Sequence, residues 1–230
     1  GKLNLNVKGF FAFPMPCQPL GWFKKTPPKT AEELKGYKYR TVGLAADLMQ
    51  ELGMKVTQLP GGEIVPAMER GVIDAFEFNN PTSDRRFGAQ DVAKNYAMGS
   101  YHQAMEFFEI VFNKKKYEAL PADMKAILKY ASEAASSSNT WLAQDSYSKD
   151  LQELITKDKV KVSRTTKAVF QAQIKAWDKI VAKLEAEDPF FKKVVESQKA
   201  WARRVAYYGF FNDADYKTAY EHVFKTKLPS

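Results

Sequence analysis

Two charged residues stand at the ends of predicted strands, where parallel sheets place their ligands. Arg40 lies near the end of a strand predicted over residues 37–42, and Glu77 near the end of one predicted over residues 72–78. An arginine there is able to hold a carboxylate with two parallel hydrogen bonds. A glutamate there is able to act as a general base or a cation ligand. Each also has a plainer interpretation: Arg40 pairs with a neighbour, and Glu77 accepts hydrogen bonds from loop amides.

Nucleophilic catalysis has one candidate, Cys17 with His102 as its base. Cys17 lies in an apolar, proline-rich segment, where a cysteine is inert unless a charged setting activates it. The sequence contains no GxGxxG fingerprint, no phosphate-binding P-loop and no GxSxG elbow. One cysteine and two distant histidines, His102 and His222, also exclude a zinc site. These residues favour a binding protein over an enzyme, and a small α/β enzyme that uses Glu77 or Cys17 is the alternative.

The elements that must position Arg40 and Glu77 alternate between strands and helices. The strand pattern occurs over residues 37–42, 55–59 and 72–78, and the helix pattern over residues 45–52 and 63–70. A glycine follows each helix, as is typical of helix C-termini. This alternation predicts a mostly parallel sheet with crossover helices, whose ligands bind beyond the carboxyl ends of the strands. Residues 79–83 are predicted to form a polar loop at that edge.

The pattern changes near residue 115, after which the chain is predicted to be mostly helical. Strands are predicted over residues 1–13, 106–113 and 160–165, and helices over residues 121–142, 167–184 and 190–208. The last helix and the residues after it carry more aromatic side chains than one core-facing stripe needs, among them Trp201, Tyr207 and Phe211.

Composition excludes several classes of protein. The 230 residues include 35 Lys and Arg against 27 Asp and Glu, which gives a formal net charge of +8. The basic residues are interleaved with acids on predicted helices, which is typical of solvated faces and argues against a nucleic-acid partner. A single cysteine excludes a disulfide scaffold, and no apolar run reaches membrane-spanning length. No signal peptide is recognisable at the start of this sequence.

Several motifs occur together in an order and spacing that are specific to one family. They are GWF (residues 21–23), LKGYKYRTVG (34–43), LPGGE (59–63), GVIDAFEF (71–78), and NK (113–114) before LP (120–121). The chain resembles the periplasmic solute-binding subunit of tripartite ATP-independent periplasmic (TRAP) transporters from about residue 9 to about residue 135, and weakly beyond. Within that family it looks most like the branch that binds 2-oxo and 2-hydroxy monocarboxylates with a cation.

The resemblance assigns expected roles to particular residues. Arg40 matches the arginine that pairs with the substrate carboxylate. Na⁺ or Ca²⁺ is expected to bridge to the ligand from Gln18, Glu77, Gln103 and the backbone carbonyl of Phe78, an all-oxygen donor set that suits a hard cation. The remaining substrate contacts are expected from Cys17, Asn79 and the ring of Phe78. Because Phe78 replaces the family's tryptophan and Cys17 a small polar residue, the substrate is expected to be larger or less polar than pyruvate.

The resemblance also implies the architecture, partners and location. We expect a type II periplasmic-binding-protein fold, with residues 10–105 as a nearly complete α/β lobe and residues 1–9 and 106–230 as the rest. The family has a further α/β segment before the position of residue 1, so the chain is expected to be a fragment. The expected function is capture of a small organic anion in the periplasm for the membrane permease subunits, and a larger aromatic or sugar-acid carboxylate is the alternative ligand. A homodimer through the C-terminal helix is a further expectation, with docking on its own domain as the alternative.

Overall fold

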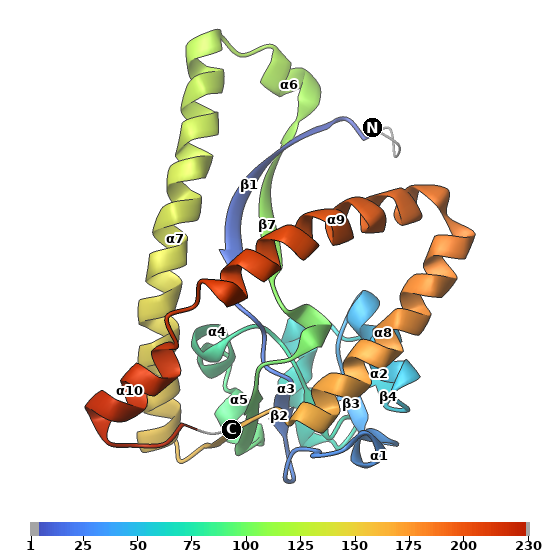
Figure 1. Ribbon diagram of the computed structural model, residues 1–230, viewed down its shortest axis with the longest axis vertical. Helices are drawn as coiled ribbons and strands as arrows, with labels where there is room; N and C mark the ends of the chain where they lie inside the picture. Colours follow the sequence, from blue (N-terminus) through green and yellow to red (C-terminus); the bar gives the residue numbers. More distant parts are fainter. Residues whose placement is uncertain (1–4, 229–230) are drawn as a thin grey trace.

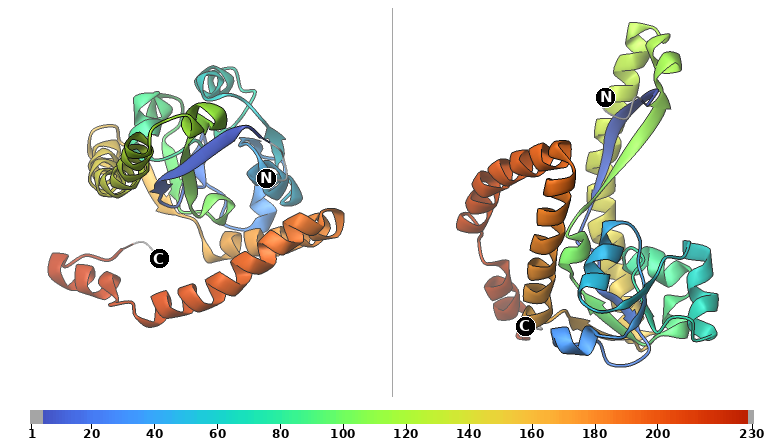
Figure 2. Two further views of the ribbon diagram at one scale, coloured as in Figure 1. Left: turned by 90° about the horizontal axis from the view of Figure 1, so that it is seen from above. Right: turned by 90° about the vertical axis from the view of Figure 1, so that its right-hand side faces the viewer.

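The structure, a computed structural model that describes residues 5–228, consists of a lobe, a ribbon and an arm (Figure 1). The lobe is built on a six-stranded sheet, and a two-stranded ribbon extends from it beside the long helix α7 (Ala122–Thr156). Helices α9 (Pro189–Phe211) and α10 (Tyr216–Phe224) form the arm, which stands beside the lobe (Figure 2). Among residues 5–228, no helix is long and apolar enough to cross a membrane.

The six-stranded sheet has the order β4-β3-β5-β2-β6-β8. Its strands are β2 (Gly21–Phe23), β3 (Lys38–Arg40), β4 (Lys55–Thr57), β5 (Ala75–Phe76), β6 (Asn95–Met98) and β8 (Lys161–Arg164). Strand β3 runs parallel to β4 and β5, and β6 runs parallel to β8, while β2 is antiparallel to both of its neighbours. The predicted α/β class with parallel strands is confirmed. Strand β2 was not predicted, because three residues are too short to show a period of two.

Short helices cover the six-stranded sheet. They are α1 (Ala31–Leu34), α2 (Leu44–Glu51), α3 (Ile64–Glu69), α4 (Pro81–Arg86) and α5 (Ala89–Val92), with single 3₁₀ turns at Gly61–Glu63 and Tyr101–Gln103. The side chain of Thr30 caps α1 by accepting a hydrogen bond from the amide of Glu33. The predicted loop over residues 79–83 is wrong from Pro81 onward, because the Asn80 side chain caps helix α4 there.

The ribbon pairs β1 (Val7–Met15) with β7 (Glu106–Asn113) in antiparallel register. Proline was expected to end β1 earlier, but Pro14 is accommodated in a two-stranded ribbon with free outer edges. Residues 1–4 of the predicted first strand lie outside the described residues. Beyond β7, helix α6 (Lys114–Glu118) leads into α7, which packs along β1 and extends past the predicted helix end at residue 142.

The C-terminal half first contributes β8 and α8 to the lobe and then forms the arm. Strand β8 forms the edge of the lobe's sheet, and α8 (Lys167–Glu187) packs against α2 and the turn that follows β6. The division at residues 10–105 therefore stays a prediction, since residues beyond 160 also contribute to this lobe. Helix α9 packs against α8, yet Val195 is its only buried residue, and Phe210 and Phe211 are 84% and 81% exposed.

Candidate functional site

Arg40 and Glu77 meet at the carboxyl end of the sheet. Arg40 is the last residue of β3, and Glu77 follows β5 directly, so the parallel pairing of the two strands places them side by side. Arg40 Nη1 lies 3.1 Å from Glu77 Oε1 and donates to the Glu77 carbonyl at 2.9 Å, and both residues are buried, with 5% and 1% exposure. Arg40 Nε donates to the carbonyl of Leu59 at 2.8 Å. Within the described residues, the remaining nitrogen, Nη2, has no recorded hydrogen bond.

Phe78 forms an apolar wall beside this pair. The centre of its ring lies 5.9 Å from Arg40 Cζ, and it packs edge-on against Phe87 at 4.9 Å. Gly61, from the LPGGE motif, closes the other side: a Cβ at this position would lie 2.7 Å from Cε2 of Phe78. The motif therefore lets its loop approach both Arg40, through the Leu59 carbonyl, and the Phe78 ring.

Two carboxamides also belong to this region: Gln18 is buried and contacts Asn79, two residues beyond Glu77, and Gln103 is half-buried. The Gln18 amide donates to the Gln103 carbonyl at 3.1 Å, which joins the loop after β1 to the turn after β6. Gln18 Nε2 donates to Glu106 Oε2 at 2.7 Å and to Asn79 Oδ1 at 3.4 Å, so its Oε1 points away from both acceptors. Within residues 5–228, Oε1 of Gln18 and Oε1 of Gln103 are buried atoms without a hydrogen-bond partner. Buried polar atoms normally have partners, so these two oxygens indicate room for a ligand.

This donor set fits a hard cation. Within residues 5–228, no group of three or more His, Cys, Asp and Glu side chains is arranged to hold a metal. The candidate donors are instead two neutral amide oxygens and the carboxylate of Glu77, and Na⁺ and Ca²⁺ bind to oxygen donors of both kinds. Glu106, which the sequence reasoning missed, orients the Gln18 amide. Burial and the negative charge of Glu77 raise the pKa of Glu106, whereas the hydrogen bond from Gln18 lowers it.

Cys17 and Asn79 lie around this site, but the proposed catalytic dyad does not form. Cys17 is exposed, and its Sγ accepts from the amide of Ser100 at 3.3 Å. His102 Nδ1 lies 2.6 Å from Ser100 Oγ, so the histidine is engaged by the serine and not by the cysteine. Nδ1 is thus no base for Cys17 in this arrangement. Asn79 Oδ1 accepts from Gln18, as above.

A buried carboxylate, Asp84, holds the segment that follows Glu77. Its Oδ1 accepts from the amides of Asn79 and Asn80 at 3.1 and 3.2 Å. Its Oδ2 accepts from Trp22 Nε1 at 2.9 Å and from the Tyr96 hydroxyl at 3.1 Å. Burial raises the pKa of Asp84 to about 6, although these hydrogen bonds lower it. This network was not predicted, because Trp22 and Tyr96 reach Asp84 from other elements of the fold.

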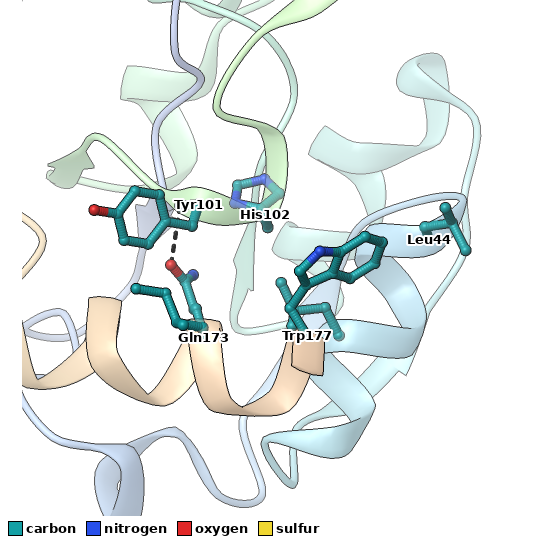
Figure 3. A pocket seen from close by; sticks show the side chains of 7 residues that line it. Leu44, Tyr101, His102, Gln173 and Trp177 are labelled. Atoms are coloured by element: carbon teal, nitrogen blue, oxygen red, sulfur yellow. Dashed lines mark hydrogen bonds between the residues drawn. The ribbon is translucent and has the colours of Figure 1, made fainter. Parts of the chain in front are cut away.

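An apolar pocket of about 360 Å³ lies beside the site (Figure 3). It is lined by Leu44 from α2, by Tyr101 and His102 from the turn after β6, and by Gln173 and Trp177 from α8. His102 joins pocket and site, since its Nε2 lies 4.0 Å from Glu77 Oε2. Helix α8 was predicted as a helix, but its part in this pocket and the pocket itself were not predicted.

Comparisons with known proteins identify the family of this chain. Residues 22–188 match the family described as bacterial extracellular solute-binding protein, family 7. A monocarboxylate 2-oxoacid-binding periplasmic protein of Nostoc sp. is 31% identical over 215 residues, which cover 93% of this chain and 58% of that protein.

Crystal structures of TRAP periplasmic solute-binding proteins are similar in fold. The protein from Colwellia psychrerythraea, with bound calcium and pyruvate, superimposes with a TM-score of 0.84 at 29% identity. The protein from Pseudoalteromonas atlantica, with bound sodium and pyruvate, does so with a TM-score of 0.83 at 30% identity. Each match covers 92% of this chain and 64% of the other.

The chain spans less than two thirds of the length of these relatives. The family model nevertheless matches well over half of the chain, and it includes the Arg40–Glu77 pair and the Gln103 turn. The likeness to TRAP solute-binding subunits inferred from the motifs is thereby confirmed. The chain belongs to family 7 of the bacterial extracellular solute-binding proteins.

Proposed function

We propose that this protein captures a small organic acid outside the cytoplasm, together with a cation, and delivers it to the membrane permease subunits of a TRAP transporter. The ligand class is a 2-oxo or 2-hydroxy monocarboxylate. The observation that carries the proposal is the buried Arg40–Glu77 pair, to which Gln18 and Gln103 each add a buried amide oxygen without a hydrogen-bond partner within residues 5–228. The relatives from Colwellia and Pseudoalteromonas, with pyruvate and calcium or sodium bound, support the same pairing of acid and cation.

Each site residue has a distinct role in this proposal. Arg40 binds the carboxylate through Nη2, because Nε and Nη1 are already held by Leu59 and Glu77. Gln18, Gln103, Glu77 and the Phe78 carbonyl would hold the cation, which would supply positive charge to the anionic ligand. The Phe78 ring excludes water on one side, which strengthens these polar contacts.

The lining of the remaining space sets the size of the acid. Cys17 and Asn79 contact the part of the ligand that extends from the carboxylate. The apolar pocket beside His102 favours an acid with an apolar tail over a sugar acid, because its walls include Leu44 and Trp177. The protein binds its ligand without turning it over, since Cys17 lacks the base that nucleophilic catalysis requires.

The aromatic arm is the proposed homodimer interface. Helices α9 and α10 expose a row of large apolar side chains at Trp201, Tyr207, Tyr208, Phe210, Phe211 and Tyr216. Apolar patches of this kind on a protein surface mark interaction sites. One related solute-binding protein, from Bordetella bronchiseptica, is 26% identical and was crystallised as a dimer, which supports this choice.

Thermal unfolding tests the binding proposal. The melting temperature of the purified protein should rise with pyruvate or with a longer 2-oxo acid, and should rise further when Na⁺ or Ca²⁺ is present, because ligands that bind only the folded state stabilise it. Arg40→Lys keeps the charge, but a single ammonium group cannot replace the separate nitrogens that contact Leu59, Glu77 and the ligand, so it should abolish the shift. Arg70→Met, at an exposed arginine, is the matched control and should keep it.

Two results would overturn the proposal. The first is the absence of any shift with 2-oxo, 2-hydroxy, aromatic and sugar acids in the presence of either cation. The second is an Arg40→Lys protein that shifts as the original does. A shift with sugar acids alone would replace the monocarboxylate class with the sugar-acid alternative.

A further inference from the structure

A side chain of helix α8 is built into the site. Gln173 is fully buried and points from α8 toward the turn that carries Tyr101 and His102 (Figure 3). The amide of Tyr101 donates to Gln173 Oε1 at 3.0 Å, which fixes which end of the carboxamide is oxygen. The other end, Nε2, therefore donates its hydrogen to Ser100 Oγ at 2.7 Å.

The donor from Gln173 determines where the Ser100 proton goes. Ser100 is fully buried, and its hydroxyl has one proton to donate. Its other recorded neighbours are the amide of His102 at 3.5 Å, which is a donor, and His102 Nδ1 at 2.6 Å. Of these two groups, only His102 Nδ1 is able to accept a hydrogen bond, so the Ser100 hydroxyl donates its proton to Nδ1. His102 Nδ1 is consequently unprotonated, and the neutral ring carries its proton on Nε2.

That Nε2 proton has no partner in the protein. The His102 side chain is fully buried, and Nε2 has no hydrogen-bond partner among the described residues. Its nearest recorded acceptor, Glu77 Oε2, is 4.0 Å away, which is beyond hydrogen-bond distance. An N–H in this tautomer has no lone pair for a cation. It is suited to an oxygen atom of a ligand that enters beside Glu77.

We infer that His102 donates its Nε2–H to an oxygen of the bound acid, and that Ser100 and Gln173 are positioning residues that hold His102 in this tautomer. The inference rests on the proposed function for the identity of the ligand. It makes His102 a specificity residue for acids that place a second oxygen next to the cation. It also makes α8, from the C-terminal half of the chain, a contributor to the site.

Nitrogen-15 NMR of the imidazole rings tests the tautomer without any ligand. The chain has two histidines, so His102 is observed beside a single exposed reference, His222, and a His222→Leu variant assigns the signals. The expected result is a neutral His102 ring with the proton on Nε2. In Gln173→Ala the Ser100 proton is released, so both tautomers become populated and the two ring signals move toward each other. A proton on Nδ1 in the original protein, or no change in Gln173→Ala, would overturn the inference.

Binding of pyruvate in the presence of Na⁺, measured by calorimetry, tests the role of the proton. His102→Leu removes the donor and should weaken binding about tenfold, the effect of one hydrogen bond to a charged group. His102→Gln keeps an N–H at similar reach and should recover part of the loss, which a merely structural role would not show. Full affinity in His102→Leu refutes the inference while the proposed function stands. If the original protein binds no acid, the proposed function fails, and the inferred role of His102 fails with it.

Discussion

Asp84 should make the stability of this protein depend on pH, because its carboxyl group is buried and its pKa is raised. It is fully buried and has no cationic partner among its recorded contacts, which are the amides of Asn79 and Asn80, Trp22 Nε1, and the hydroxyls of Ser83 and Tyr96. Burial of the charge is the largest cause, and it raises the pKa of Asp84 from 3.8 to about 6. Tyr96 and Tyr147 are the titratable groups whose pKa values respond to its charge.

The sign and size of the effect follow from proton linkage. Because the folded protein binds the Asp84 proton more tightly than the unfolded chain does, this group's contribution to stability is complete below pH 3.8 and is lost as the pH rises through about 6. The full difference is about 3 kcal/mol, since one pKa unit corresponds to about 1.4 kcal/mol. Between about pH 7.5 and about pH 5, the share that is recovered is about 1 kcal/mol.

Urea unfolding of the original protein and of Asp84→Asn at these two pH values measures this share. The free energy of unfolding of the original protein, relative to the variant, should be about 1 kcal/mol greater at the lower pH. Other titrating groups, including Glu106, are common to both proteins and cancel in the comparison. Asp47→Asn, at an exposed carboxylate on α2, is the control and should show no such difference. Equal pH dependence in the original protein and in Asp84→Asn would refute the reasoning.

Three further predictions concern strand β2, the cation and the arm. Gly21→Ala should lower the free energy of unfolding by at least about 2 kcal/mol in urea unfolding, because φ is 121° and the new Cβ would lie 2.1 Å from a backbone oxygen. Gly62→Ala is the control and should be tolerated. Equal stability of the two variants would contradict the geometry. Glu106→Ala should weaken the Na⁺ or Ca²⁺ enhancement of the thermal shift, because Gln18 loses the acceptor that orients it; an unchanged enhancement argues against that role. Phe211→Ser should reduce self-association in analytical ultracentrifugation, and a monomeric original protein would remove the arm as an interface.

Much of the lobe could be predicted from local pattern. The strands around Arg40 and Glu77 and the helices between them are signalled by side-chain period, glycine stops and one capping threonine. Boundaries were less accurate: α4 replaces part of a predicted loop, and α7 is longer than predicted. Short strands such as β2 carry too few residues to show a period, so their membership in the sheet depends on partners elsewhere in the chain.

The candidate site divides in the same way. Arg40 and Glu77 were identifiable because a charged residue at the end of a buried strand is conspicuous, and the family motifs indicated Gln18, Gln103 and Phe78. Glu106 and Asp84 were not identifiable, because their significance comes from contacts with residues distant in sequence. The same holds for Gln173, which reaches Ser100 across 73 positions of the chain.

The sequence by itself determined the types of group available: one strand-end arginine, one buried acid, a set of amide oxygens, and the family in which these occur. Only the tertiary structure decided how those groups are used. It pairs Arg40 with Glu77, leaves the amide oxygens of Gln18 and Gln103 without partners among residues 5–228, and places His102 Nδ1 against Ser100 Oγ. The physical reason is that hydrogen bonds and burial depend on distances between atoms far apart along the chain, whereas period and spacing report only on neighbours within one element.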